Sequence, residues 1–216
     1  MIHQQTEIRI PVGSVKVEGT LTLPSGAKGV VLFAHGSGSS RFSTRNQYVA
    51  KEFNKSALGT LLFDLLTAEE EETDVLTAEF RFNIPLLANR LIGVTEWLRN
   101  DPKTKNLAFG YFGASTGAAA ALIAAAKLPG EVAAVVSRGG RPDLAGKYLA
   151  SVVAPTLLLV GGLDTEVIEL NQQAIERMTA EKKLVIIPGA THLFEEPGKL
   201  EEVAKFSIEW FLRYLR

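Results

Sequence analysis

Short apolar runs recur along the chain and alternate with longer segments of mixed polarity. The run GVVLFA at Gly29–Ala34 is typical of a strand buried on both faces of a sheet. Five further runs predict buried strands at residues 60–63, 106–111, 132–136, 156–160 and 183–187. Closer to the N-terminus, residues 7–10 and 15–23 alternate between apolar and polar positions. This alternation predicts two antiparallel strands joined by a turn at residues 11–14.

The segments between these runs predict helices at residues 43–56, 84–100, 115–127, 165–178 and 198–214. In the second of them, Leu87, Leu91 and Val94 fall near one face, as in an amphipathic helix. Strands that alternate with helices predict an α/β fold with a mostly parallel sheet of about seven to eight strands and helices on both faces. The sequence contains neither an internal repeat nor a domain linker, so we expect residues 1–216 to form a single domain.

Two connecting segments lead to further predictions. Residues 69–74, EEEETD, are a run of like charges, which favours a solvated loop. Residues 137–155 lie between two buried strands and are too few to form an inserted cap domain. Because ligands bind beyond the carboxyl ends of parallel strands, we expect an uncapped site that is open to solvent at that edge of the sheet.

Composition and charge narrow the classes of protein. Hydrophobic residues make up 46% of the chain and charged residues 22%, as in ordinary soluble domains. The net charge of -1 does not favour nucleic acid as a partner. The N-terminal residues show no signal-peptide pattern, and the longest apolar run, residues 118–126, is shorter than the roughly 20 residues of a membrane span. We therefore expect a cytoplasmic protein that does not enter a membrane.

The most informative motif is GASTG at residues 113–117, between an apolar run and an alanine-rich one. The pattern G-x-S-x-G is typical of a sharp strand-to-helix turn that exposes a nucleophilic serine, here Ser115. Glycines flank such a turn because larger side chains would collide with the neighbouring strand or helix. The chain has no cysteine, which excludes disulfides, thiolate metal sites and a cysteine nucleophile.

A nucleophilic serine needs a base, and the base needs a group that orients it. His192 follows the last predicted strand and is the candidate base, since His3 lies near the terminus and His35 ends a strand. Asp164 follows the strand at residues 156–160 and is the candidate acid. Two alternatives remain open: Asp164 caps the next helix, or Asp143 is the acid.

Negative charge that develops on a carbonyl oxygen is usually received by two backbone N–H groups. The first candidate donor is Thr116, which follows the nucleophile at the start of a helix. The second is Ser37 in the segment HGSG, with Gly36 and Gly38 as alternatives. This segment could instead be a flexible loop or a phosphate-binding nest, although the lysine of a phosphate-binding loop is missing.

Three arginines are candidates for binding an anionic group of the substrate, such as a carboxylate. Arg41 follows the HGSG segment, and Arg138 and Arg141 follow the strand at residues 132–136. All three could lie at the carboxyl edge of the sheet. The alternative is that arginines of this chain form ion pairs with the acidic residues 69–74.

Together, the segments FAHGSGSS, GASTG, GGLD and GATHLF resemble the α/β-hydrolase superfamily. The chain is similar to its small, lidless dienelactone hydrolase family over nearly its whole length, which implies that fold and the order Ser115, Asp164, His192 for the catalytic residues. Members proper of that family have cysteine in the G-x-C-x-G turn. With Ser115 there, we expect a general serine esterase that acts on a small-molecule ester, as a monomer or homodimer.

We expect neither a cofactor nor a metal, because the sequence lacks a dinucleotide-binding fingerprint and an H-E-x-x-H motif. Two groups of alternatives remain open for the activity. One is a thioesterase, peptidase or perhydrolase on the same scaffold. The other is a non-catalytic, hydrolase-like protein that binds a small ligand.

Overall fold

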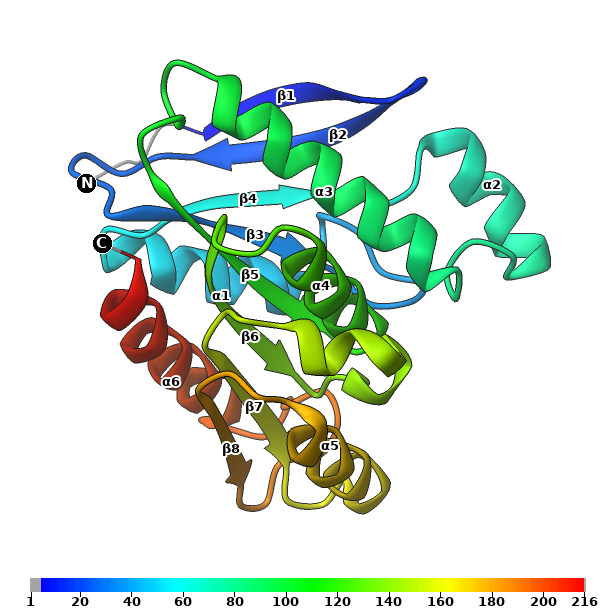
Figure 1. Ribbon diagram of the computed structural model, residues 1–216, viewed down its shortest axis with the longest axis vertical. Helices are drawn as coiled ribbons and strands as arrows, with labels where there is room; N and C mark the ends of the chain where they lie inside the picture. Colours follow the sequence, from blue (N-terminus) through cyan, green and yellow to red (C-terminus); the bar gives the residue numbers. More distant parts are fainter. Residues whose placement is uncertain (1–4, 216) are drawn as a thin grey trace.

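A computed structural model describes residues 5–215 and contains one eight-stranded sheet (Figure 1). The strands follow the order β1-β2-β4-β3-β5-β6-β7-β8. The hairpin of β1 and β2 is antiparallel, and β2 pairs antiparallel with β4, whereas the strands from β4 to β8 are all parallel. The strand bounds are Gln5–Val12, Val15–Thr22, Gly29–Ala34, Gly59–Phe63, Ala108–Ala114, Val132–Arg138, Thr156–Gly161 and Lys182–Ile187 for β1 to β8.

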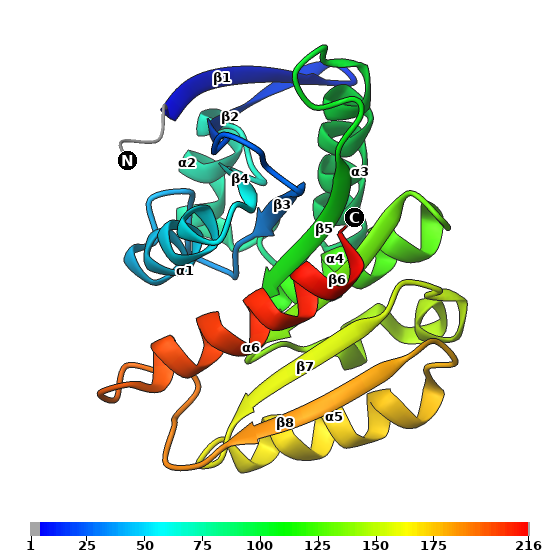
Figure 2. The same cartoon turned by 90° about the vertical axis from the view of Figure 1, so that its left-hand side faces the viewer.

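Helices cover both faces of the sheet (Figures 1 and 2). On one face lie α3, α4, the 3₁₀ segment η1 and α5, and on the other α1 packs beside α6. The helix α2 stands apart from both layers, beyond the end of β4 (Figure 1). The helical bounds are Thr44–Lys55, Ala68–Thr77, Ile84–Asn100, Thr116–Lys127, Thr165–Arg177 and Lys199–Tyr214 for α1 to α6, with Pro142–Ser151 for η1. The predicted α/β architecture is therefore confirmed.

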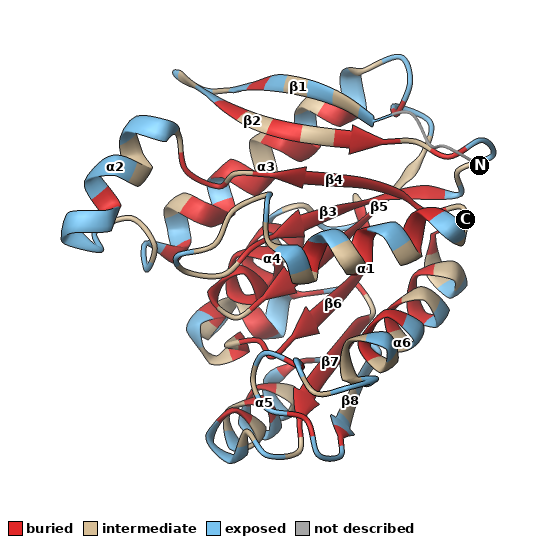
Figure 3. Cartoon of the chain, turned by 180° about the vertical axis from the view of Figure 1, so that it is seen from behind, coloured by how far each residue is buried: buried red, intermediate tan, exposed pale blue. Residues whose placement is uncertain are grey.

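The central strands are buried on both faces (Figure 3). Every residue of β3, β4 and β7 is buried, as their continuous apolar runs predict. Two hydrophobic clusters result. One lies under α3 and α4 and includes Leu91 and Leu122, and the other lies under α1 and α6 and includes Phe53 and Phe211. This packing holds the carboxyl ends of the strands in one row.

Some boundaries differ from the predictions. β1 extends to Val12, so the hairpin turn is shorter than predicted and is made at Gly13, whose φ is +60°. β5 and β6 run on to Ala114 and Arg138, beyond their predicted ends, because both strands keep pairing with each other there. The extra residues bring Ser115 and Arg138 side by side at the carboxyl edge.

The prediction of a solvated loop at residues 69–74 is wrong, because these residues belong to α2. Thr67 and Glu70 form a capping box, in which each side chain receives a backbone N–H of the other residue. Three acidic residues in the first turn also favour a helix, since they face the positive end of its dipole. The charge run thus stabilises a helix start.

The connection between β6 and β7 contains only η1, which is kinked at Gly146. Within residues 5–215 no cap domain is inserted over the carboxyl edge, as the length of this segment predicts. None of the described helices is both long and apolar enough to span a membrane.

Candidate active site

The candidate nucleophile lies at the turn between β5 and α4. Ser115 has φ 51° and ψ -123°, a conformation that non-glycine residues rarely adopt. Backbone hydrogen bonds hold it there: its N–H donates to the carbonyl of Arg138 at 3.3 Å, and its own carbonyl accepts from the N–H of Arg141 at 3.1 Å. Strain of this kind persists only when its surroundings enforce it, and it is common at functional sites.

The flanking glycines make this turn possible. A Cβ on Gly117 would lie 2.1 Å from the carbonyl oxygen of Ala34, and a Cβ on Gly113 would lie 2.4 Å from Cα of Ala118. Both contacts are with backbone atoms, which cannot move aside easily. The close approach of β3, β5 and α4 at Ser115 therefore requires glycine at both positions, as the G-x-S-x-G pattern predicts.

The candidate base and acid are in direct contact. Nδ1 of His192, after β8, lies 2.6 Å from Oδ2 of Asp164, after β7. Asp164 precedes α5 but makes no capping hydrogen bond with its side chain, so its carboxylate is available to the imidazole. The other candidate acid, Asp143, pairs with Arg141 instead. The geometry thus favours Asp164 as the partner of His192.

The hydroxyl of Ser115 and the ring of His192 form no hydrogen bond with each other in the described part of the chain, where the ring contacts Asp164. Both flank the end of β6. Ser115 binds the carbonyl of Arg138, and a Cβ on the next residue, Gly139, would lie 3.6 Å from Cε1 of His192. Catalytic hydrogen bonds are often long or absent in unliganded enzymes and shorten once substrate binds.

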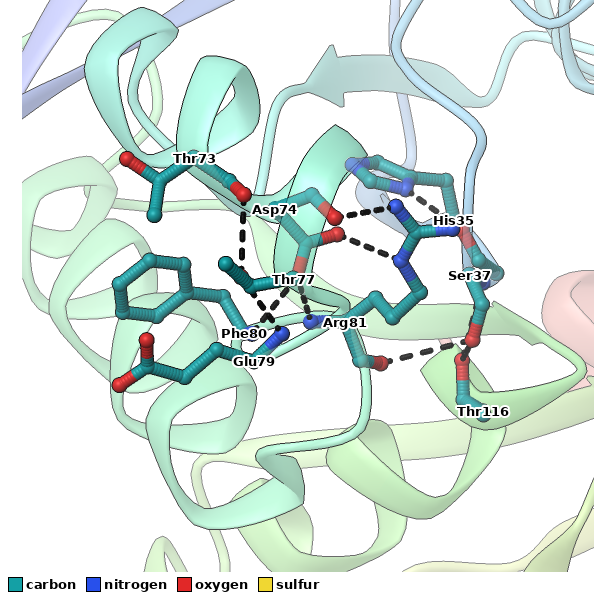
Figure 4. Close-up of polar contacts among 10 residues, drawn as sticks. His35, Ser37, Thr73, Asp74, Thr77, Glu79, Phe80, Arg81 and Thr116 are labelled. Atoms are coloured by element: carbon teal, nitrogen blue, oxygen red, sulfur yellow. Dashed lines mark hydrogen bonds and ion pairs between the residues drawn. The ribbon is translucent and has the colours of Figure 1, made fainter.

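The candidate oxyanion donors lie at the same place. The N–H of Ser37 donates to Oγ1 of Thr116 at 3.1 Å, and the two hydroxyls lie 3.0 Å apart (Figure 4). Thr116 itself is in the first turn of α4, where N–H groups have no acceptor within the helix. An oxyanion at Ser37 would therefore have to share or replace the Thr116 hydroxyl as the acceptor.

His35 fixes the segment that carries Ser37. Its Nε2 accepts the N–H of Leu65 at 3.0 Å, so the neutral ring carries its proton on Nδ1, which lies 3.0 Å from the carbonyl oxygen of Gly36. Burial lowers the pKa of His35, which keeps the ring neutral although Asp64 acts in the opposite direction. Within residues 5–215, the ring nitrogens of His35 are thus engaged by Gly36 and Leu65.

Sequence reasoning missed a buried brace behind this segment (Figure 4). Asp74 of α2 is 1% exposed and accepts hydrogen bonds from the N–H groups of Phe80 and Arg81 and from Nε of Arg81. Burial raises the pKa of Asp74, but these donors outweigh it, and the pKa lies below its ordinary value. The carbonyl of Arg81 in turn accepts the Ser37 hydroxyl at 3.4 Å. The spacing of Thr67 and Glu70, typical of a capping box, is a sequence signal that could have predicted a helix here.

The three candidate arginines differ in their contacts. Arg41 forms an ion pair with Asp64, and Arg141 donates to both carboxylate oxygens of Asp143 at 2.9 and 2.8 Å. Arg138 is 7% exposed, and its Nε and Nη1 have no acceptor among residues 5–215. None of the three pairs with the acidic segment 69–74, whose Asp74 binds Arg81.

Two large clefts are lined in part by Arg41, one of the three candidate arginines. One of about 940 Å³ is bounded by Gly38, Ser39 and Ser40, by Asp64, and by the start of α2. The other, of about 780 Å³, lies between α1 and the N-terminal hairpin. Neither is lined by Ser115 or His192. No group of three His, Asp or Glu side chains in the described chain is arranged to hold a metal ion.

Comparison with known proteins identifies the relatives of this chain. The model of the dienelactone hydrolase family matches residues 19–213. The crystal structure of dienelactone hydrolase from Anabaena variabilis has a TM-score of 0.98 at 58% identity, over 99% of each chain. An esterase from Pyrococcus furiosus has a TM-score of 0.81 over 99% of this chain and 92% of its own, and at 18% identity this likeness concerns the fold alone.

Curated relatives from two strains of Mycobacterium tuberculosis are 57% identical over 209 residues. They bear the provisional name of phosphoribosyl transferase. The match covers 97% of this chain and 46% of each relative, so the chain spans about half the length of the curated relatives it matches. The family match, the structural likeness and the geometry of the carboxyl edge lead to one conclusion: this chain has the α/β-hydrolase fold and belongs to the dienelactone hydrolase family.

Proposed function

We propose that the chain is a serine hydrolase that cleaves a carboxylic ester of a small molecule through an acyl-enzyme intermediate. The observation that carries this proposal is the 2.6 Å contact between His192 and Asp164 at the edge where Ser115 is held in its strained turn. A serine, an imidazole and an orienting carboxylate in this relation are the groups that acyl transfer needs.

In the proposed reaction, the Ser115 hydroxyl attacks the ester carbonyl while Nε2 of His192 removes its proton. Asp164 holds Nδ1–H of the ring and stabilises the imidazolium that forms. The N–H groups of Thr116 and Ser37 receive the oxyanion, which requires Ser37 to release the Thr116 hydroxyl. The imidazolium then protonates the leaving alcohol, and a water molecule activated by His192 releases the acid.

Labelling with a fluorophosphonate, together with hydrolysis of 4-nitrophenyl acetate, tests the proposal. We expect Ser115→Ala to abolish labelling and to lower kcat by a factor on the order of 10⁴–10⁶. Ser25→Ala, in the exposed turn after β2, is the matched control and should remain fully active. A Ser115→Ala protein that hydrolyses the ester at the wild-type rate would refute the proposal.

The scaffold is equally suited to thioesters, peptide bonds or peroxide as acceptor, and a panel of these substrates separates the alternatives. A hydrolase-like binding protein is a further alternative, and it would fold normally yet resist labelling. We do not propose phosphoribosyl transfer, since the relatives of that name are more than twice as long as the match. A cytoplasmic location and a monomeric or homodimeric state remain our predictions.

A further inference from the structure

The loop that carries His192 contains a strained residue. Phe194 has φ +58°, in the left-handed region that a bulky side chain rarely adopts. Its ring is fully buried in the hydrophobic cluster under α1 and α6. Backbone strain persists only where surrounding contacts enforce it, and it is common at functional sites. The buried ring of Phe194 supplies such a contact two residues after the candidate base.

A carboxylate holds the residue on the other side of His192. Glu196 accepts the N–H of Thr191 on both of its oxygens, at 3.1 Å each, and accepts the Thr191 hydroxyl on Oε1 at 2.6 Å. The hydrogen bond from the Thr191 side chain is the largest cause that lowers the pKa of Glu196 below its ordinary value. The acceptor therefore stays ionised well below neutral pH.

The turn between these two residues is fixed from several directions. The N–H of Phe194 donates to the carbonyl of Thr191 at 3.3 Å. Gly139 lies against the turn, since an added Cβ there would be 2.9 Å from the carbonyl oxygen of His192 and 3.3 Å from Cε2 of Phe194. The backbone of His192 is thus held between the hydrophobic core, the carboxylate of Glu196 and the end of β6.

The ring of His192 depends on this backbone for its direction. Its side chain is 39% exposed, and its one side-chain hydrogen bond among residues 5–215 is with Asp164. A single hydrogen bond at Nδ1 fixes the distance to the carboxylate but leaves the ring free to swing about that contact. The direction of Nε2 is therefore set by where the loop places the Cα atom of His192.

We propose that Phe194 and Glu196 are positioning residues that direct Nε2 of His192 toward the Ser115 hydroxyl. Both act through the backbone of the loop and neither reacts with the substrate. The inference rests on the proposed function and deepens it, because it names two groups besides Asp164 that place the base. Such placement matters, since a misplacement of 1 Å can lower the rate about 10²-fold.

Variants of the solvent-accessible pair Thr191 and Glu196 test the inference with little effect on folding. Glu196→Ala should lower kcat for 4-nitrophenyl acetate about 10-fold and leave KM nearly unchanged, because the direction of the base affects the chemical step and not binding. Glu196→Gln keeps one acceptor oxygen and should recover much of the loss. The rate should likewise be lower in Thr191→Val than in Thr191→Ser, which keeps the hydroxyl donor. Glu181→Ala, which removes the surface ion pair with Arg213, is the control and should keep the wild-type kcat.

Replacement of the buried ring separates positioning from stability. Phe194→Leu leaves an apolar side chain that fills less of its site in the core. Phe53→Leu is the matched control, since Phe53 is equally buried in the same cluster but belongs to α1. Both variants should melt at a lower temperature, and only Phe194→Leu should also lower kcat. If Phe194→Leu does not fold, the variants of Glu196 and Thr191 decide the question.

The direction of the ring is also measured without turnover, by proton NMR of the Ser115→Ala protein. The Nδ1 proton that His192 shares with Asp164 should give a strongly deshielded signal, because this hydrogen bond is short and charge-assisted. Loss of the signal in His192→Asn identifies it. We expect Glu196→Ala to shift or broaden this signal and Glu181→Ala to leave it in place.

Failure of this inference is distinguishable from failure of the proposed function. An unchanged kcat together with an unchanged Nδ1 signal in Glu196→Ala overturns the positioning role even if Ser115 proves essential. An equal loss of kcat in Glu181→Ala also overturns it. Full activity of Ser115→Ala overturns the serine mechanism, but the NMR comparison still shows whether the loop sets the direction of the ring.

Discussion

Replacement of Gly139 by alanine tests the placement of His192 more sharply than replacement of the histidine itself. Gly139 has φ +50°, and an added Cβ would lie 2.9 Å from the carbonyl oxygen of His192 and 3.6 Å from Cε1 of its ring. Gly146, with φ +55°, provides a matched control, since a Cβ there meets nothing within 4 Å. Both variants place a side chain at positive φ, but only Gly139→Ala brings it against His192.

An alanine at such a positive-φ position costs on the order of 1–3 kcal/mol of backbone strain. For a chain of this size, each 1 kcal/mol lowers the melting temperature by about 2–4 °C, so both variants should melt roughly 2–12 °C lower. In Gly139→Ala the His192 backbone must also move by several tenths of an ångström to relieve the contact. Since a 1 Å misplacement of a catalytic group can lower the rate about 10²-fold, we expect a decrease in kcat of about 10-fold in this variant alone.

Thermal unfolding and the hydrolysis of 4-nitrophenyl acetate, measured on both variants below their melting temperatures, distinguish the two effects. Equal kcat values for Gly139→Ala and Gly146→Ala, with equal losses of stability, would show that turnover does not depend on the position of His192. That result would remove His192 from the mechanism even if Ser115 proved to be the nucleophile.

Three further predictions concern the support of the site. Thr67→Ala removes one half of the α2 capping box and should lower the free energy of unfolding by about 1 kcal/mol, as measured by urea denaturation. The pKa of Asp74 is lowered in the folded state, so its stabilising effect is present above its unfolded pKa of about 3.9 and is lost as pH falls through its folded value. Asp74→Asn should therefore flatten the acid limb of a plot of stability against pH. The pKa of His35 is also lowered in the folded state. As pH falls below about 6.5, the histidine therefore binds a proton in the unfolded chain, whereas it stays neutral in the folded protein. Stability should decrease from pH 7 to pH 5, and less so in His35→Asn.

Much of the frame could be predicted from the sequence because its signals are local. The apolar run at Gly29–Ala34 and the helix at Ile84–Asn100 have the predicted bounds. The G-x-S-x-G pattern is also a local consequence of packing, since Gly113 and Gly117 leave no room for a Cβ. The atoms that crowd Gly117 belong to Ala34, far along the chain, but the five-residue pattern is short enough to recognise in a single sequence.

The contacts of Asp74 behind the HGSG segment could not be predicted in the same way. Whether Asp74 lies in solvent or in the interior depends on the return of the chain at residues 80 and 81, which supplies its donors. The charge run suggested solvent, and the Thr67–Glu70 spacing, which could have indicated a helix, says nothing about the burial of Asp74. Long-range pairing of this kind decides both the burial of Asp74 and the direction of its pKa shift.

The arginines show why chemistry at the site needs the structure. In the sequence, Arg41, Arg138 and Arg141 are equivalent, since each follows a buried strand. Their difference arises from register: β6 continues to Arg138 in phase with Val136, which directs this side chain to the apolar face toward Arg45. Arg141 lies beyond the strand and is free to turn back to Asp143. A strand one residue shorter in its pairing would not have fixed Arg138 in this direction, so the burial of this side chain is a consequence of the extended β5–β6 ladder.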